Sequence, residues 1–305
     1  MSSVDVLIPT YNPDPRFLKE ALESLQAQTF TNWKAFIHED PSDGDTASIV
    51  KPFLSDERIT FKKSPERLGI GGNWNACFNA TSAPIIAYLF QDDLWTPDYL
   101  ETAVNIMNDN TGVGLVAMGH EYKFEDTSGS KRCFKRLLRI KKKRFPSGII
   151  DGDKFLKKWL RRSFWPNLVG EPDFVVMSRG EMELAGLPAE ARSAQAGPFH
   201  PTMKQLLDTE YWVRMLEITD LYNETKNLGQ FRVHGGAATA QNRVDGRGIF
   251  DRLEIISRFI KKGSVLTRVT AIFAFVIQIL RMVFHAFKHP LLALKLFKKI
   301  LPIKH

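Results

Sequence analysis

Two adjacent carboxylates, Asp92 and Asp93, follow directly after an apolar run at residues 85–90. That run has the length and composition of a strand buried on both faces of a parallel sheet. Thr96 and Pro97 then have the pattern of an N-cap and a first helical position. Two carboxylates between a strand end and a helix start suit a hard cation such as Mg²⁺ or Mn²⁺, which shares its ligand sphere with water and phosphate oxygens. Because Asp is also common in ordinary turns, the pair alone leaves both interpretations open.

Two further polar clusters follow strand-like runs in the first half of the chain, residues 9–12 after the run 4–8 and residues 39–40 after the run 33–37. Strand and helix patterns alternate there with short polar connections, which predicts an α/β fold with a doubly wound, mostly parallel sheet. In such sheets ligands bind beyond the carboxyl ends of the strands. We therefore expect both clusters to meet the carboxylate pair in space.

Hydrophobic spacing predicts further elements. Helices are expected near residues 17–28, 46–54, 73–80 and 153–161, and strands at 59–61, 174–177 and 229–233. Asp208 opens another helical pattern, where its side chain could cap the helix, act as a carboxylate base, or do both. His234 follows the last strand and could be a turn or core histidine or a metal ligand.

Six segments, taken in order, resemble glycosyltransferase family 2 and its GT-A fold. They are residues 4–12, 36–42, 73–75, 91–93, 207–214 and 232–236. The series extends over roughly three quarters of the chain. No single motif is strong, and the ordered set carries the resemblance.

The resemblance implies roles on the donor side of the site. Pro9 and Tyr11 match positions that border the nucleotide base, Tyr11 by stacking, although Tyr11 could also serve only in packing. Asp40 matches the acid that accepts a hydrogen bond from the imide N–H of uracil or thymine. Asn75 falls in the helix that faces the sugar-nucleotide, and Asp92 matches the position nearest the ribose.

On the metal and acceptor side, the resemblance makes Asp93 the main ligand of a divalent cation, Mn²⁺ or Mg²⁺. His234 resembles a late histidine that approaches the metal and the diphosphate. Asp208 matches the carboxylate that deprotonates the acceptor hydroxyl, and Glu210 is a weaker functional candidate.

The chain departs from the common family pattern at three positions, Pro41, Gln91 and Leu207. Gln91 replaces the first Asp of the usual Asp-x-Asp triplet, Pro41 replaces a Gly, and Leu207 replaces an acid. None of these changes removes a group that the implied mechanism requires.

The implied activity is a metal-dependent, inverting transfer of a hexosyl-type sugar. The donor would be a nucleotide-diphosphate sugar of the UDP or dTDP type. The acceptor would be a hydroxyl of a glycan or lipid-linked acceptor in cell-envelope polysaccharide synthesis. A cation that offsets the charge of the diphosphate and one carboxylate base are enough for a single in-line displacement. A nucleotidyltransferase is an alternative, but it would normally carry a Gly-rich basic loop where residues 10–13 read Thr-Tyr-Asn-Pro.

The net charge of +8 is unevenly distributed. Residues 131–145 hold nine Lys or Arg and no acid, and residues 255–305 hold ten and no acid. Because both stretches also carry many apolar residues, they predict contact with an anionic membrane surface; a solvated basic face and a docked tail are the alternative. Basic segments also suit a nucleic-acid-binding protein, but the sequence has no helix-turn-helix, zinc-finger or RNA-recognition pattern, so we expect no nucleic-acid partner.

Two cysteines, Cys77 and Cys133, form no metal spacing or disulfide framework, which favours a reducing cytoplasm. The first residues have no signal-peptide pattern. The longest apolar stretch, residues 269–280, is too short to span a bilayer comfortably. We therefore expect a cytoplasmic protein that is peripheral at the inner face of the cytoplasmic membrane.

The expected organisation is a GT-A domain at residues 1–240 followed by a basic, apolar helical tail at residues 241–305. Within the domain, the nucleotide-binding half extends to about residue 125 and the acceptor half follows it to residue 240. Pro290 is expected to divide the tail into two helices.

Overall fold

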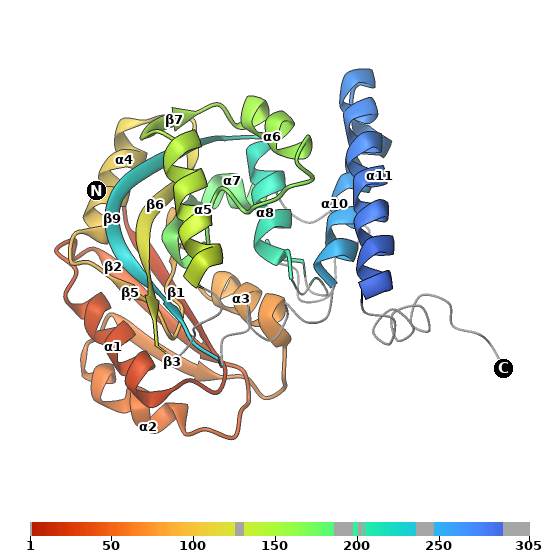
Figure 1. Cartoon of the computed structure of the whole chain (residues 1–305). Helices are drawn as coiled ribbons and strands as arrows, with labels where there is room; N and C mark the ends of the chain where they lie inside the picture. Colours follow the sequence, from red (N-terminus) through yellow and green to blue (C-terminus); the bar gives the residue numbers. More distant parts are fainter. Residues whose placement is uncertain are drawn as a thin grey trace. The chain divides into compact units, whose positions relative to one another are not determined.

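The computed structural model describes residues 2–125, 131–185, 198–200, 203, 205–235 and 247–288. Within these residues lies a nine-stranded sheet in the order β3-β2-β1-β4-β8-β6-β9-β5, with β7 paired to β9 (Figure 1). Its strands are β1 Val4–Thr10, β2 Trp33–Glu39, β3 Ile59–Lys63, β4 Ile85–Tyr88, β5 Leu94–Trp95, β6 Val113–Phe124, β7 Gly148–Ile150, β8 Val175–Ser178 and β9 Asp220–Val233.

Parallel pairs join β3, β2, β1 and β4 to one another, and β6 to β9. Strand β8 connects these two groups through antiparallel pairs with β4 and β6, and β5 and β7 are antiparallel to β9. Hence β1, β2, β3, β4, β6 and β9 point one way, and β5, β7 and β8 point the other. The predicted α/β fold with a mostly parallel sheet is confirmed.

The helices of the described residues include those expected near residues 17–28, 46–54, 73–80 and 153–161 and the one that begins near Asp208. They are α1 Pro15–Gln26, α2 Thr46–Val50, α3 Gly69–Asn79, α4 Tyr99–Asp109, α5 Lys131–Arg144, α6 Gly152–Leu160, α7 Arg179–Leu184, α8 Leu207–Leu216, α10 Arg247–Lys262 and α11 Val265–Lys288, with short 3₁₀ turns at Lys51–Ser55 and Pro172–Phe174. Helix α1 begins with Pro15 at its first position, where the Asp14 side chain accepts from the N–H groups of Arg16 and Phe17. An N-cap carboxylate and a first-turn proline are the usual start of a helix.

The predicted helix start at Thr96 and Pro97 is wrong by two residues. Helix α4 begins at Tyr99 with Asp98 at the N-cap position. Thr96 is still held by the sheet, because its N–H donates to the carbonyl of Leu228 in β9 at 2.9 Å.

Helices cover both faces of the sheet, as a doubly wound fold requires. On one face, Val6 of β1 and Ala87 of β4 belong to a core cluster with residues of α1 and α4. On the opposite face, α3 packs against β1 and β2. There the hydroxyl of Tyr88, the strand neighbour of Ala87, donates to the carbonyl of Trp74 in α3 at 3.1 Å. The side-chain alternation of β4 therefore places consecutive residues in two separate cores.

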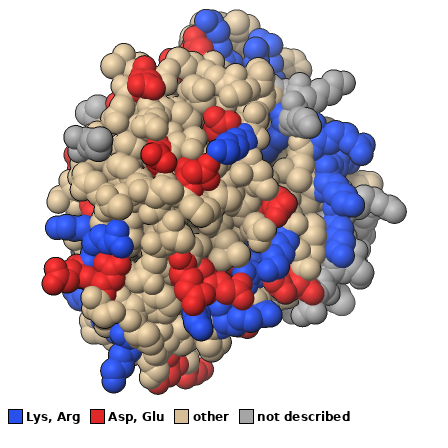
Figure 2. Space-filling model, turned by 90° about the vertical axis from the view of Figure 1, so that its left-hand side faces the viewer, with Lys and Arg blue, Asp and Glu red and all other residues tan. Residues whose placement is uncertain are grey.

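The basic run of residues 131–145 forms helix α5, which is fixed by its apolar positions. The buried Phe134 ring packs on Tyr122 of β6, with ring centroids 4.5 Å apart. Lys135, Arg136 and Arg139 remain exposed. On the face drawn in Figure 2, Lys and Arg side chains gather along the right-hand edge and alternate with Asp and Glu elsewhere.

The chain divides into two compact units. Unit 1 consists of residues 1–156, 167–203 and 207–234 and contains the whole sheet, and unit 2 consists of residues 157–166, 204–206 and 235–305. In unit 2, helices α10 and α11 pack against each other through buried positions that include Ala271 and Ala274. The predicted helix break at Pro290 lies outside the described residues.

Candidate active site

The carboxyl ends of β1, β2 and β4 lie at one edge of the sheet, where hydrogen bonds join the loops that follow them. The N–H of Asp40 donates to the carbonyl of Thr10 at 2.9 Å. Across the other side of β1, Gln91 binds the backbone of Tyr11. The predicted convergence of the three polar clusters is therefore confirmed.

Gln91 makes a two-point contact with Tyr11. Its Oε1 accepts from the Tyr11 N–H at 2.8 Å, and its Nε2 donates to the Tyr11 carbonyl at 3.2 Å. An aspartate could not replace it, because a carboxylate has no proton to donate to a carbonyl. The departure from the Asp-x-Asp triplet thus has a structural reason: Gln91 ties the loop after β1 to the loop after β4.

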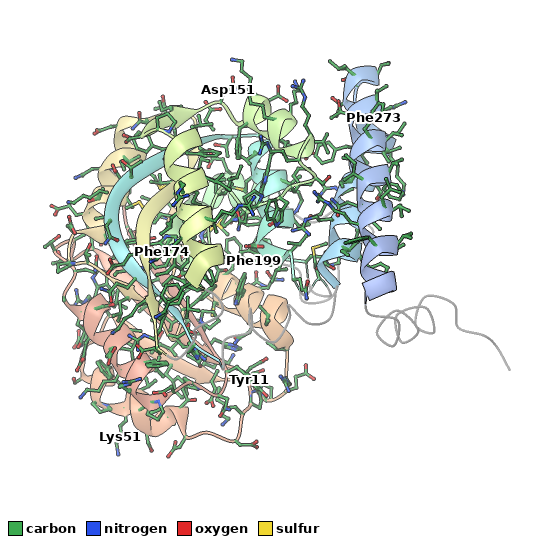
Figure 3. The ribbon with its side chains drawn as sticks, in the orientation of Figure 1. Tyr11, Lys51, Asp151, Phe174, Phe199 and Phe273 are labelled. Atoms are coloured by element: carbon green, nitrogen blue, oxygen red, sulfur yellow. The ribbon has the colours of Figure 1, made fainter. Side chains whose placement is uncertain are left out.

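Tyr11 presents its ring at this edge (Figure 3), and 42% of the residue is exposed. The guanidinium carbon of Arg67 lies 4.2 Å from the centre of the Tyr11 ring. Pro9 is buried in β1, two residues before it. An exposed aromatic face beside a cationic group can receive a flat, electron-rich ring such as a nucleotide base.

Asp92 and His234 form a carboxylate–imidazole pair at this edge. Nε2 of His234 lies 2.9 Å from Oδ2 of Asp92, and their side chains are 19% and 21% exposed. The hydrogen bond with Asp92 raises the pKa of His234 above its ordinary value. The edge of the His234 ring also contacts Phe17, with centroids 5.2 Å apart, which fixes the ring from the side of α1. Both side chains are partly exposed and meet in this one contact.

Asp93, in contrast, is directed into the protein and is only 1% exposed. Its Oδ1 accepts from the N–H of Arg232 at 2.6 Å, and the carboxyl group of the buried Asp173 is close to it. Burial, and then the neighbouring charge of Asp173, raises the pKa of Asp93 well above its ordinary value. Burial likewise raises the pKa of Asp173. Two carboxyl groups in one buried space hold a shared proton more readily than two negative charges.

The two acids at the carboxyl end of β2, Glu39 and Asp40, have different environments. Asp40 is fully engaged: its two oxygens accept from the N–H groups of Leu68 and Gly69, both at 2.8 Å. Gly69 has a positive φ of 73°, so the loop turns there into α3 at a residue without a Cβ. Glu39 is equally buried, but its Oε2 has no hydrogen-bond partner among the described residues. Its Oε1 accepts from the hydroxyl of Ser42 at 3.2 Å and lies 3.4 Å from Nζ of Lys63. A buried carboxylate oxygen without a hydrogen-bond partner requires an explanation, such as a bound water, an ion or a ligand donor.

The side-chain amide of Asn75 hydrogen-bonds the backbone of Phe199 at two points. Its Nδ2 donates to the Phe199 carbonyl at 2.7 Å, and its Oδ1 accepts from the Phe199 N–H at 2.9 Å. Figure 3 shows Phe199 beside α3 and α8. Trp74, which precedes Asn75, packs its ring edge-to-face on Phe199, with centroids 4.9 Å apart. Asn75 therefore positions the segment before α8.

Asp208 lies in the first turn of α8 and is partly exposed. Burial of most of its carboxyl group raises its pKa to about 6. Its Oδ2 accepts from Nδ2 of Asn167 at 2.7 Å, and its Oδ1 accepts from the N–H of Thr209 at 2.6 Å. A carboxylate with this pKa is largely ionised at neutral pH and is a stronger base than an ordinary Asp.

Glu210 has a different role from its neighbour Asp208. It forms a two-point ion pair with Arg214, with contacts of 2.8 and 2.9 Å, and both side chains are 3% exposed. Arg214 also donates to the carbonyls of Ala185 and Pro198. Glu210 is therefore a buried structural residue that fixes α8 to the two preceding segments.

No group of three or more His, Cys, Asp or Glu side chains is arranged as a metal cage anywhere in the described ranges. Asp92 and His234 nevertheless form a fitting partial set, because Mn²⁺ and Mg²⁺ are commonly held by one or two protein ligands together with water and substrate phosphates.

Four residues that contact the candidate site residues were not predicted from the sequence: Arg67, Asn167, Asp173 and Arg232. Glu39 was expected at this edge, but without a role of its own. Glu39 is adjacent to the predicted Asp40, and only the side-chain environments distinguish the two. Asn167 and Asp173 lie in a stretch without regular spacing, where no local pattern indicates an approach to Asp208 or Asp93.

Comparison with known proteins finds a match to the family described as Glycosyl transferase family 2 over residues 5–164. A similar protein in Escherichia coli is WfgD, a UDP-Glc:alpha-D-GlcNAc-diphosphoundecaprenol beta-1,3-glucosyltransferase. It is 30% identical over 107 residues, which are 35% of this chain and 42% of WfgD. The chain thus matches less than half of the length of that relative.

Two solved structures share the fold. TarS 1–349 of S. aureus in complex with UDP-GlcNAc has a TM-score of 0.64 at 12% identity, covering 90% of this chain and 70% of that one. The mannosyltransferase PcManGT of Pyrobaculum calidifontis, in complex with GDP-Man and Mn²⁺, has a TM-score of 0.59 at 15% identity, covering 99% and 81%. The expected GT-A fold is confirmed by these likenesses.

Proposed function

Because the chain belongs to glycosyl transferase family 2, we propose that it transfers a sugar from a nucleotide-diphosphate sugar to a hydroxyl group, with inversion at the anomeric carbon. The acceptor is proposed to be a glycan or lipid-linked sugar in cell-envelope polysaccharide synthesis. The name of WfgD, with its UDP-linked donor and diphosphoundecaprenol-linked acceptor, supports this class. The observation that carries the proposal is that an accessible Asp92–His234 pair and the elevated-pKa carboxylate of Asp208 lie in the family's fold.

Asp92 and His234 are proposed to hold the divalent cation, Mn²⁺ or Mg²⁺. A cation bound there would offset the charge on the diphosphate leaving group. The sequence suggests Asp93 as the main ligand. It is proposed instead to fix the loop after β4 to β9, because its carboxyl group is buried and accepts from the N–H of Arg232. The Mn²⁺ bound with GDP-Man in PcManGT supports metal dependence.

The nucleotide is proposed to bind over Tyr11, with its base stacked on the ring and Pro9 behind it. Glu39 is proposed to accept the imide N–H of a uracil or thymine base through its unpaired Oε2, while Asp40 shapes the pocket by holding the start of α3. This exchanges the roles that the sequence suggests for these two acids. Donors of the UDP or dTDP type carry such an imide.

Asp208 is proposed as the base. The acceptor oxygen attacks the anomeric carbon, and the bond from that carbon to the diphosphate oxygen breaks. The hydroxyl proton passes to a carboxylate oxygen of Asp208. Burial that keeps the Asp208 pKa at about 6 leaves the group ionised at neutral pH and able to accept this proton.

Helix α11 is proposed to attach the protein to an anionic membrane surface at the cytoplasmic face. Residues Val265–Phe284 of this helix are long and apolar enough to cross a membrane, judged by length and composition alone. The side opposite its buried positions carries exposed apolar residues, including Phe273 (Figure 3) at 68% and Leu280 at 63%. Arg268 and Arg281 are exposed on the same helix, and residues 255–305 contain no acid, so the charge suits anionic headgroups.

Vesicle flotation tests the membrane proposal. We expect the protein to float with vesicles of anionic lipid, and the double variant Phe273→Glu, Leu280→Glu to remain in solution. Ile149→Glu with Ile218→Glu is the matched control, since both residues are exposed apolar positions of unit 1. Equal flotation of the α11 variant and the control would refute the proposal.

The enzymatic proposal is tested by a screen of nucleotide sugars for metal-dependent release of the nucleoside diphosphate. We expect activity with a UDP- or dTDP-linked hexose, and its loss in Asp208→Asn with donor binding retained. A protein that releases no nucleotide from any sugar donor, with or without acceptor glycolipid, would contradict the proposal.

A further inference from the structure

The Asn167 side chain is held in one orientation by the backbone three residues later. Its Oδ1 accepts from the Gly170 N–H at 3.1 Å, and its Nδ2 donates to the Gly170 carbonyl at 2.8 Å. Oδ1 is bound to an N–H and Nδ2 to a carbonyl, so a flip of the amide group would lose both hydrogen bonds. Gly170 has a φ of 143°, a conformation that L side chains rarely adopt. Trp212 of α8 also donates to the Gly170 carbonyl, at 3.0 Å.

The second proton on Nδ2 of Asn167 is directed at Asp208, whose Oδ2 lies 2.7 Å away. The other carboxylate oxygen accepts from the N–H of Thr209. Each oxygen of Asp208 therefore has one fixed donor, one from its own helix and one from Asn167. Each retains a further lone-pair direction for a proton from a bound molecule.

We propose that Asn167 is the positioning residue of the transfer reaction: it orients the Asp208 carboxylate and stabilises its ionised form. This inference rests on the proposed role of Asp208 as base. The geometry explains why a backbone-locked amide suits this place. An acceptor hydroxyl must meet a defined lone pair of the base, and a misalignment of about 1 Å can lower the rate by as much as 100-fold.

Other charged groups also face Asp208. Glu171 raises its pKa through like charge, and the hydrogen bonds from Thr209 and Asn167 lower it. Glu171 is itself balanced by Lys141 of α5, whose Nζ lies 3.9 Å from its carboxylate, and by His120 of β6 at 3.3 Å. Removing the donor from Asn167 leaves the burial and the charge of Glu171 in place. The pKa of Asp208 should therefore rise.

The experiment compares Asn167→Ala, the isosteric Asn167→Asp and the wild-type enzyme by the pH dependence of kcat/KM. We expect the acid limb to move upward by about 1 pH unit in Asn167→Ala, and further in Asn167→Asp, where a second carboxylate faces the base. At pH 8, where the base is ionised in the Ala variant, kcat should still fall about 10- to 100-fold through misorientation. The donor KM should change less than about twofold, since the donor contacts lie elsewhere.

Trp212→Phe is the matched control. It removes the other side-chain donor to the Gly170 carbonyl but does not touch Asp208, so the acid limb should remain at its wild-type position. A ¹³C titration of the Asp208 carboxyl group by NMR supplies a readout that needs no activity, with Asp208→Asn to assign the signal. An unchanged Asp208 titration in a folded Asn167→Ala variant would overturn the inference. Absence of transfer by the wild-type enzyme would instead overturn the proposed function.

Discussion

The buried pair of Glu210 and Arg214 gives a prediction that does not depend on the substrate. Arg214 holds both oxygens of Glu210 and the carbonyls of Ala185 and Pro198, and both charged side chains are almost fully buried. In Arg214→Ala the carboxylate of Glu210 loses its counter-charge in a site that is almost fully buried. Removing one member of a buried ion pair costs about 3 to 5 kcal/mol. For a domain of this size each kcal/mol lowers the melting temperature by roughly 2 to 4 °C, so the variant should melt roughly 6 to 20 °C lower.

The measurement is urea unfolding followed by Trp fluorescence, since Trp212 lies on the same helix. The double variant Glu210→Gln, Arg214→Met should recover a large part of the loss, because it leaves no buried charge. It should not recover all of it, because the carbonyls of Ala185 and Pro198 remain without their donor. A loss below about 1 kcal/mol in Arg214→Ala would refute a buried ion pair. Loss of transfer in a stable Glu210→Gln variant would refute a purely structural role for Glu210.

Three further predictions follow from the site. The rate should fall as the pH drops below about 6, because protonation of Asp208 removes the acceptor for the hydroxyl proton. The pH profile of the wild-type enzyme checks this, with Asp208→Asn as the inactive reference. Glu39→Gln should weaken binding of UDP by about 10-fold and leave the fold intact, as measured by calorimetry; unchanged affinity would assign the base contact elsewhere. Gln91→Glu should weaken donor binding by a similar factor because it loses the donor to the Tyr11 carbonyl, whereas unaltered binding would show that the tie between the two loops is dispensable.

The sheet and its functional edge could be predicted because the signals are local. Apolar runs of strand length, polar residues after them and helical spacing between them place residues 9–12, 39–40 and 91–93 at one edge, whatever the remaining topology. The strands at 174–177 and 229–233 were also expected, but the antiparallel pairing of β8, the full length of β9 and the strand β6 depend on pairings between distant segments, which no local pattern specifies.

The division of labour within each acidic cluster could not be predicted for a related reason. Glu39 and Asp40 are adjacent, and so are Asp92 and Asp93. In each pair one carboxylate accepts from backbone N–H groups, Asp40 from the start of α3 and Asp93 from Arg232. The other contacts side chains, Glu39 those of Ser42 and Lys63 and Asp92 that of His234. The backbone partners of Asp40 and Asp93 lie about 30 and 140 residues away along the chain, so the sequence of the motif does not reveal them.

Calorimetric titration of UDP- and dTDP-sugars with and without Mn²⁺ tests the central claim most directly. We expect metal-dependent binding to the wild-type protein and its loss in Asp92→Asn. Asp208→Asn serves as the matched control, and it should bind the donor with wild-type affinity. Asp93→Asn should keep metal-dependent binding, though weakened, because an amide oxygen can still accept from the N–H of Arg232. Metal-independent binding, or full metal dependence in Asp92→Asn together with its loss in Asp93→Asn, would contradict the account.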